Sequence, residues 1–125
     1  QSILWFFETD FGQEILANSK RVKREQPFSM LKEAQDVYLD FDEEGAELLI
    51  HGMIDGYIEY DDHVVLYDFK TDSFIKDEAA FIQNYQGQLR LYKEALQEAL
   101  NKQVTDVYLI ALSAKKIIAL KEKSL

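Results

Sequence analysis

The sequence HVVLYDFKTD, residues 63–72, is the segment that is most informative about the fold. Its run from Val64 to Tyr67 is apolar at every position, which is typical of a central strand buried on both faces. Its end is polar, and because side chains alternate along a strand, Asp68 and Lys70 point to the same side. The segment therefore predicts a buried strand that carries a carboxylate and an ammonium group together at its end.

Further strands are predicted on both sides of this segment. Residues 47–60 are predicted as a long strand interrupted by Gly52 and Gly56, and Asp61 and Asp62 form the turn that follows it. Earlier in the chain, residues 22–30 contain Pro27 and are predicted as an edge-type extended segment. The remaining predictions are a short strand over 37–41, an acidic turn over 42–45, and closing strands over 106–112 and 116–121.

Apolar residues at steps of three and four predict two helices. The first covers residues 3–16, with a possible interruption near Gly12, and the second begins at Asp77 and ends at about Leu100. One stripe of the second helix consists of Phe81, Tyr85, Gln88, Tyr92, Ala95 and Ala99. The fold class is α/β, a mixed central β-sheet flanked by helices, and we expect a single domain over residues 1–125.

Composition restricts the classes of function. The chain has no cysteine, which excludes disulfides, zinc–thiolate sites and cysteine-held iron–sulfur clusters, and the cytoplasm is the expected location. No apolar run approaches the roughly 20 residues of a membrane helix. The net charge of −9 argues against nucleic-acid binding through a broad basic surface. Residues 20–24 are a local basic run that suits either phosphate contacts or a solvated helix end.

Two aspartates are predicted to converge. A hairpin that turns at Asp61 and Asp62 returns Asp55 to the side of Asp68, and Mg²⁺ needs only one or two protein carboxylates because it keeps several waters. Lys70 on the same strand would orient a water molecule or neutralise charge on phosphorus. The alternative for Asp68 and Lys70 is a surface ion pair of little energetic value.

Four motifs occur in one order along the chain. They are R-E-x-P-F at Arg24, Glu25, Pro27 and Phe28, G-x-x-D at Gly52 and Asp55, D-x-K-T at Asp68, Lys70 and Thr71, and Q-x-x-x-Y at Gln88 and Tyr92. This combination resembles the RecB-like branch of the PD-(D/E)xK nuclease superfamily, and within it the C-terminal nuclease domains of the AddA (RexA) family of helicase–nuclease subunits. The resemblance extends from about Phe6 to Leu112.

The resemblance implies a restriction-endonuclease-like (PD-(D/E)xK) core and a role for each motif residue. Asp55 and Asp68 would be metal ligands, Lys70 a catalytic residue and Glu25 an acidic member of the site. Gln88, Tyr92 and Thr71 would support these groups or position DNA. The implied cofactor is Mg²⁺, for which Mn²⁺ can substitute.

The resemblance also implies partners and a parent protein. The activity would be 3′-to-5′ exonucleolytic hydrolysis of single strands during double-strand-break repair, with DNA and the second nuclease subunit, AddB (RexB), as partners and no membrane. ATP would serve only the helicase part, since no Walker-type G-x-x-x-x-G-K-[ST] loop occurs in this sequence. The chain would be a C-terminal fragment of the larger protein.

The sequence departs from the branch in one respect. Its members supply a histidine metal ligand from a helix before the R-E-x-P-F motif, whereas the two histidines here are His51 and His63, both after Arg24. We expect the chain to begin after that helix, which would weaken metal binding. His51 lies either near the metal or in a packed or exposed position. The alternatives are a non-catalytic docking module of the same fold, or a phage or CRISPR-associated nuclease.

Overall fold

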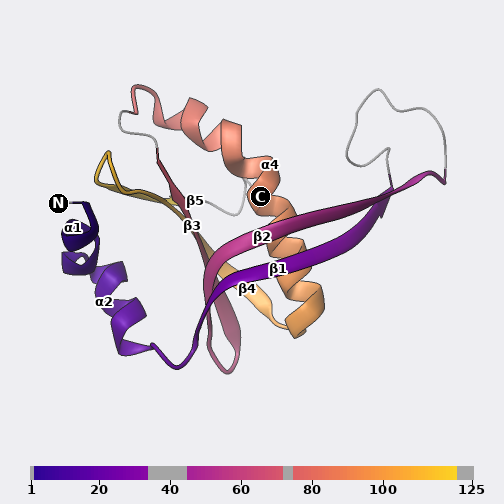
Figure 1. The fold of residues 1–125 in the computed structure, drawn as a ribbon, viewed down its shortest axis with the longest axis horizontal. Helices are drawn as coiled ribbons and strands as arrows, with labels where there is room; N and C mark the ends of the chain where they lie inside the picture. The colour runs from indigo at the N-terminus through magenta and orange to yellow at the C-terminus, as the bar shows by residue number, and fades with distance from the viewer. Residues whose placement is uncertain (1, 34–44, 72–74, 121–125) are drawn as a thin grey trace.

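The computed structural model describes residues 2–33, 45–71 and 75–120 (Figure 1). Its elements in chain order are α1 Ser2–Glu8, α2 Asp10–Ala17, β1 Val22–Glu33, β2 Glu47–Glu59, β3 His63–Lys70, α4 Glu78–Leu100, β4 Gln103–Ala111 and β5 Lys116–Leu120. The predicted helix over 77–100 is confirmed. The strands predicted over 22–30, 47–60, 63–72, 106–112 and 116–121 are confirmed as well, because each overlaps one of the five observed strands. The predictions for residues 37–41, 42–44, 72 and 121 lie outside the described residues.

The five strands form one mixed sheet in the order β1-β2-β3-β4-β5. Only β3 and β4 are parallel, and α4 connects them, as a parallel crossover requires. The side chains of β3 alternate between two cores. Val64 and Leu66 pack in the cluster that includes α4, whereas Val65 and Tyr67 pack with α1 and α2. The prediction of a central strand buried on both faces is therefore confirmed.

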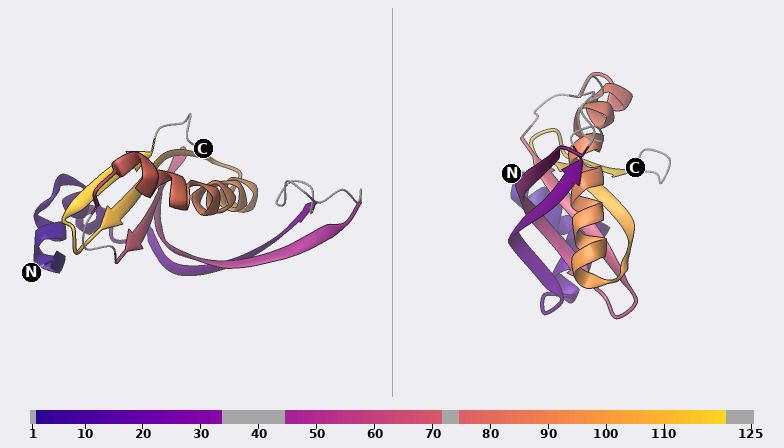
Figure 2. Two further views of the ribbon diagram at one scale, coloured as in Figure 1. Left: turned by 90° about the horizontal axis from the view of Figure 1, so that it is seen from above. Right: turned by 90° about the vertical axis from the view of Figure 1, so that its right-hand side faces the viewer.

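The ribbon formed by β1 and β2 extends well beyond the rest of the sheet (Figure 2). The two strands pair in one antiparallel register from Val22↔Ile58 to Glu33↔Glu47, in which only the position of Glu25 is left out. Strand β2 pairs with β3 only from Gly56 to Glu59. Beyond Gly56 the ribbon leaves β3, and it continues beside α4, where Lys32 forms an ion pair with Glu94. The edge position predicted for residues 22–30 is confirmed.

The predicted interruption of β2 by its glycines is wrong, because the strand is continuous from Glu47 to Glu59. Each glycine instead provides space for an aromatic ring. A Cβ on Gly52 would lie 2.4 Å from Cε1 of Phe28, and one on Gly56 would lie 2.3 Å from the Tyr67 ring. The glycines of the G-x-x-D segment thus reflect close packing within an intact strand.

The N-terminal helix is interrupted at Thr9, whereas the sequence indicated a position near Gly12. The Thr9 side chain caps α2 by accepting a hydrogen bond of 3.0 Å from the backbone N–H of Gly12. A Cβ on Gly12 would lie 2.0 Å from the carbonyl oxygen of Phe6, so glycine permits the close packing of α1 and α2. None of the described helices is long and apolar enough to cross a membrane.

Candidate metal and catalytic site

The candidate site lies where β2 separates from β3. Gly56↔Tyr67 is the pair at the end of their ladder, and Asp55, the residue before Gly56 on β2, is the first one outside it. Its side chain replaces the missing backbone partner, because the Phe69 N–H donates a hydrogen bond of 2.8 Å to Oδ2 of Asp55. The hairpin therefore places Asp55 beside the end of β3, as the sequence predicted.

Asp68 is the one charged residue that is buried among the described residues, with 3% of its surface exposed. Burial is the main cause that raises its pKa from 3.8 to about 6, and the neighbouring Asp55 carboxyl raises it further, while Lys70 acts in the opposite direction. The Asp55 carboxyl group therefore lies close to that of Asp68. Near neutral pH, Asp68 binds a proton far more readily than an exposed aspartate would.

Among the described residues, the Oδ2 atom of Asp68 has a cation beside it but no well-directed hydrogen-bond donor. Lys70 Nζ lies 2.7 Å away as an ion pair. A buried carboxylate oxygen normally accepts at least one hydrogen bond. This oxygen therefore has unused capacity to bind a positive ligand.

Lys70 is fixed by groups from two elements. Its side chain is 14% exposed, and apart from Asp68 it contacts two residues of α4. Nζ donates a hydrogen bond of 2.9 Å to Oε1 of Gln88, and it lies 4.2 Å from the centroid of the Tyr85 ring. The contact with Gln88 joins two of the four motifs. The contact with Tyr85 was missed by the sequence reasoning, which assigned that residue to a packing stripe, although its three-residue spacing from Gln88 places both on one helix face.

Tyr92 lies near the carboxylates but is part of the core. It is buried, and its ring meets the Phe28 ring edge-on at 5.2 Å, which links the Q-x-x-x-Y and R-E-x-P-F motifs. Burial is the main cause that raises the pKa of its hydroxyl, and the charges of Asp68 and Asp55 raise it further.

Three other sequence candidates remain outside this cluster. Glu25 is exposed and lies between Arg24↔Gly56 and Gln26↔Ile54, level with Asp55, with a left-handed backbone at φ 52°. Thr71 is exposed just after β3, and His51 is exposed on β2 opposite Ser29. Within residues 2–33, 45–71 and 75–120, no three His, Cys, Asp or Glu side chains are arranged to hold a metal ion. Glu25 therefore does not join Asp55 and Asp68 in such a group.

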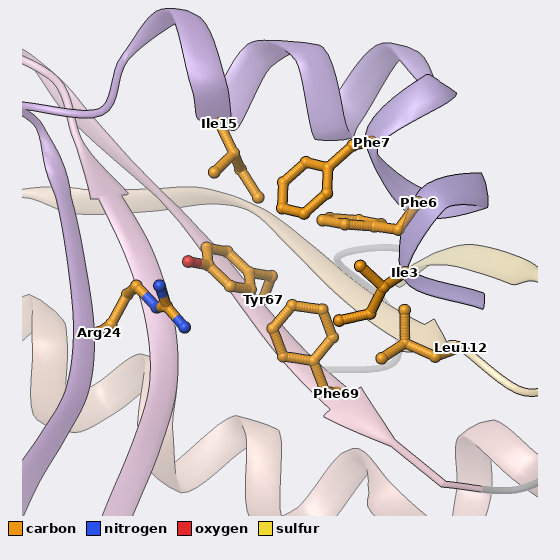
Figure 3. Close-up of a pocket in the computed structure, with 8 residues that line it drawn as sticks. All are labelled: Ile3, Phe6, Phe7, Ile15, Arg24, Tyr67, Phe69 and Leu112. Carbon is orange, nitrogen blue, oxygen red and sulfur yellow. The ribbon is translucent and has the colours of Figure 1, made fainter. Parts of the chain in front are cut away.

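An apolar pocket of about 450 Å³ lies on the opposite face of β3 from Asp68 and Lys70 (Figure 3). Its walls include Phe7 and Phe69, and Arg24 extends toward it from β1. Because alternation directs Phe69 to this side, the pocket is separate from the carboxylate pair, and it contains no acidic residue.

Comparison with known proteins relates the chain to one type of enzyme component. It is 44% identical over 124 residues to the A subunit of the ATP-dependent helicase/nuclease of Enterococcus faecalis, an alignment that covers 94% of this chain and 10% of that protein. It is 42% identical over 119 residues to a protein of Streptococcus pneumoniae named exonuclease/helicase subunit RexA, with 95% and 9% covered. The corresponding protein of Lactobacillus gasseri is 40% identical over 124 residues, with 94% and 10% covered.

No family model matches the chain. Its similarity to these relatives is nonetheless continuous over almost its whole length, so the chain is homologous to a segment of the A subunit of ATP-dependent helicase/nucleases. It spans about a tenth of the length of these relatives.

Proposed function

We propose that this chain is the nuclease segment of such a helicase/nuclease and hydrolyses DNA phosphodiester bonds with Mg²⁺ at Asp55, Asp68 and Lys70. The buried Asp68 oxygen that lacks a hydrogen-bond donor, beside a second carboxylate and a fixed ammonium group, carries the proposal. The relatives' names combine helicase and nuclease. This sequence has no Walker-type loop but does have an acidic pair with a lysine, so the nuclease is the activity that it fits.

The residues present fit a hard divalent cation. Asp55 and Asp68 supply only oxygen atoms, which Mg²⁺ and Mn²⁺ prefer, and two carboxylates suffice because Mg²⁺ retains several waters. When bound, such an ion lowers the pKa of a water molecule and offsets negative charge that develops on phosphorus. The raised pKa of Asp68 means that this carboxyl group must lose its proton before it can bind a cation with its full negative charge.

The chain's own groups would orient the substrate. Lys70 is largely buried and held by Gln88, so its ammonium group is preorganised to donate to a phosphate oxygen or to the attacking water. Asp55 is held in turn by the Phe69 N–H. The net charge of −9 gives little general attraction for DNA, and we propose that the helicase part of the parent protein delivers the strand to this site, with AddB (RexB) as the partner of that protein.

Cleavage of end-labelled single-stranded DNA tests this function. It is measured for the chain and for the complete helicase/nuclease protein that carries it, with Mg²⁺, with Mn²⁺ and with EDTA. We expect Asp68→Asn and Lys70→Gln each to lower the cleavage rate by about 100-fold or more. Asp106→Asn is the matched control. Because Asp106 is exposed on β4, this variant should cleave DNA like the wild type. Wild-type rates in the two site variants of the complete protein would refute the assignment. Labels at the 3′ and 5′ ends report the polarity.

The lack of a third acidic or histidine ligand among the described residues favours a second candidate, a docking module that has the nuclease fold without catalysis. Calorimetric titration of the chain with Mn²⁺ separates the two functions. A nuclease site should release heat on binding that is lost in Asp55→Ala. A docking module should give the same trace, without specific binding, in the wild type and the variant.

A further inference from the structure

The surroundings of Lys70 contain an aromatic contact that the four motifs do not include. Tyr85 lies three residues before Gln88 on α4, and its ring centroid is 4.2 Å from Lys70 Nζ. An ammonium group over the face of an aromatic ring is attracted by the ring quadrupole, and the attraction grows when both groups are shielded from water. Lys70 is 14% exposed and Tyr85 is half-buried, so this contact is partly shielded.

The Tyr85 ring is itself held in place. It packs edge-on against Phe81, one helical turn earlier, with ring centroids 5.2 Å apart and planes at 75°. Phe81 is buried in the core between α4 and the sheet. The core therefore supports the Tyr85 ring through Phe81 as well as through its contact with Lys70.

The three contacts of Lys70 differ in chemistry. Asp68 supplies charge, Gln88 accepts a hydrogen bond, and the ring attracts the cation without accepting a directed hydrogen bond from it. A ring in this place restrains the ammonium group while its remaining N–H groups stay available. A second polar acceptor would instead compete with a phosphate oxygen for those N–H groups.

We propose that Tyr85 is a positioning residue whose ring holds the Lys70 ammonium group in place for phosphodiester cleavage. The inference rests on the proposed function, because Lys70 matters to the reaction only if the site is a nuclease. It adds a residue to the site whose contribution depends on the ring face and not on the hydroxyl group.

The contact is tested first without any activity measurement. In the NMR spectrum of the metal-free chain, the ring current of Tyr85 should shift the ε-methylene protons of Lys70 upfield. The shift should persist in Tyr85→Phe, which keeps the ring, and disappear in Tyr85→Leu, which keeps only apolar volume. A Lys70 signal that is the same in the wild type and Tyr85→Leu would overturn the proposal.

Cleavage by the complete helicase/nuclease protein then tests the role of the contact. We expect Tyr85→Leu to lower kcat by about 10-fold with an unchanged KM for DNA, and Tyr85→Phe to stay close to the wild type. The matched control is Tyr108→Leu, since Tyr108 is also half-buried but packs on Phe11 on the other face of the sheet. In a Lys70→Gln background, Tyr85→Leu should cause no further loss, because its effect passes through the lysine.

Failure of this inference can be distinguished from failure of the proposed function. If Lys70→Gln abolishes cleavage while Tyr85→Leu matches Tyr108→Leu, the positioning role is wrong and the nuclease site stands. Equal losses in Tyr85→Phe and Tyr85→Leu would likewise overturn it, since the ring alone would then not suffice. If Lys70→Gln cleaves at the wild-type rate, the proposed function fails, and the positioning role fails with it.

Discussion

Replacing Asp68 by asparagine should make the stability of the chain depend less on pH. The carboxyl group of Asp68 has a pKa of about 6 in the folded chain against 3.8 for an unperturbed aspartate. The folded state therefore binds this proton more tightly than the unfolded state does. The resulting stabilisation is fully present below pH 3.8 and is lost as the pH rises through about 6.

The size of this effect follows from the interval between the two pKa values. At about 1.4 kcal/mol per pH unit, the interval from 3.8 to about 6 corresponds to about 3 kcal/mol, of which about 2 kcal/mol is lost between pH 4 and pH 7. Asparagine has nearly the same shape and does not titrate. The free energy of unfolding of Asp68→Asn, minus that of the wild type, should therefore rise by about 2 kcal/mol over this range.

Urea unfolding at fixed pH values, in the presence of EDTA, measures this difference directly. A constant offset caused by the substitution itself does not matter, because only the change with pH is used. Asp106→Asn, measured in the same way, serves as the control for removing an exposed carboxylate. A difference between Asp68→Asn and the wild type that is flat from pH 4 to pH 7 would show that Asp68 is not a perturbed buried acid.

Three further predictions concern the metal and the frame of the site. At pH 8, Mg²⁺ at 100 times its dissociation constant should raise the free energy of unfolding of the wild type by about 2.7 kcal/mol and leave Asp68→Asn unchanged, as urea titrations with and without metal would show. Gly56→Ala should lower stability by about 1–3 kcal/mol, because the new Cβ would lie 2.3 Å from the Tyr67 ring, whereas Gly87→Ala on α4 meets no atom within 4 Å and should raise it by about 0.5–1 kcal/mol. Asp77→Ala should cost about 1 kcal/mol in thermal or urea unfolding, because its Oδ1 accepts a hydrogen bond of 3.0 Å from the Ala79 N–H at the start of α4.

The parts of the fold that were predictable have strong local signals. The apolar run from Val64 to Tyr67 indicated a strand buried on both faces, and the two cores of the structure account for it. The helix over 78–100 combines an apolar stripe with a capping aspartate at Asp77. The two aspartates at residues 61 and 62 marked the turn that sets the β2–β3 register, and with it the approach of Asp55 to β3.

The features that were missed depend on contacts between distant segments. Nothing local shows that β1 and β2 pair over their full lengths while β2 and β3 share only a short ladder. Gly52 suggested a break in the strand, because the residues around it give no sign of the Phe28 ring that lies against it. The left-handed backbone of Glu25 has no signal either, since this conformation is uncommon for any residue other than glycine. Tyr85 was assigned to packing because Lys70, which lies over its ring, belongs to β3 and is distant from it in the sequence.

The separation of β2 from β3 and the chemistry of the site have one structural cause. Where the ladder stops, the Phe69 N–H loses its backbone acceptor, and the Asp55 carboxylate takes that place. Asp55 is thereby fixed next to Asp68, but the hydrogen bond that it accepts does nothing for Asp68, whose Oδ2 stays without a donor. A ladder continued by two more pairs, to Ile54 opposite Phe69, would satisfy the backbone without the Asp55 side chain and would remove the reason for that carboxylate to stay beside Asp68. The end of the short β2–β3 ladder therefore creates both the acidic pair and its unused capacity for a cation.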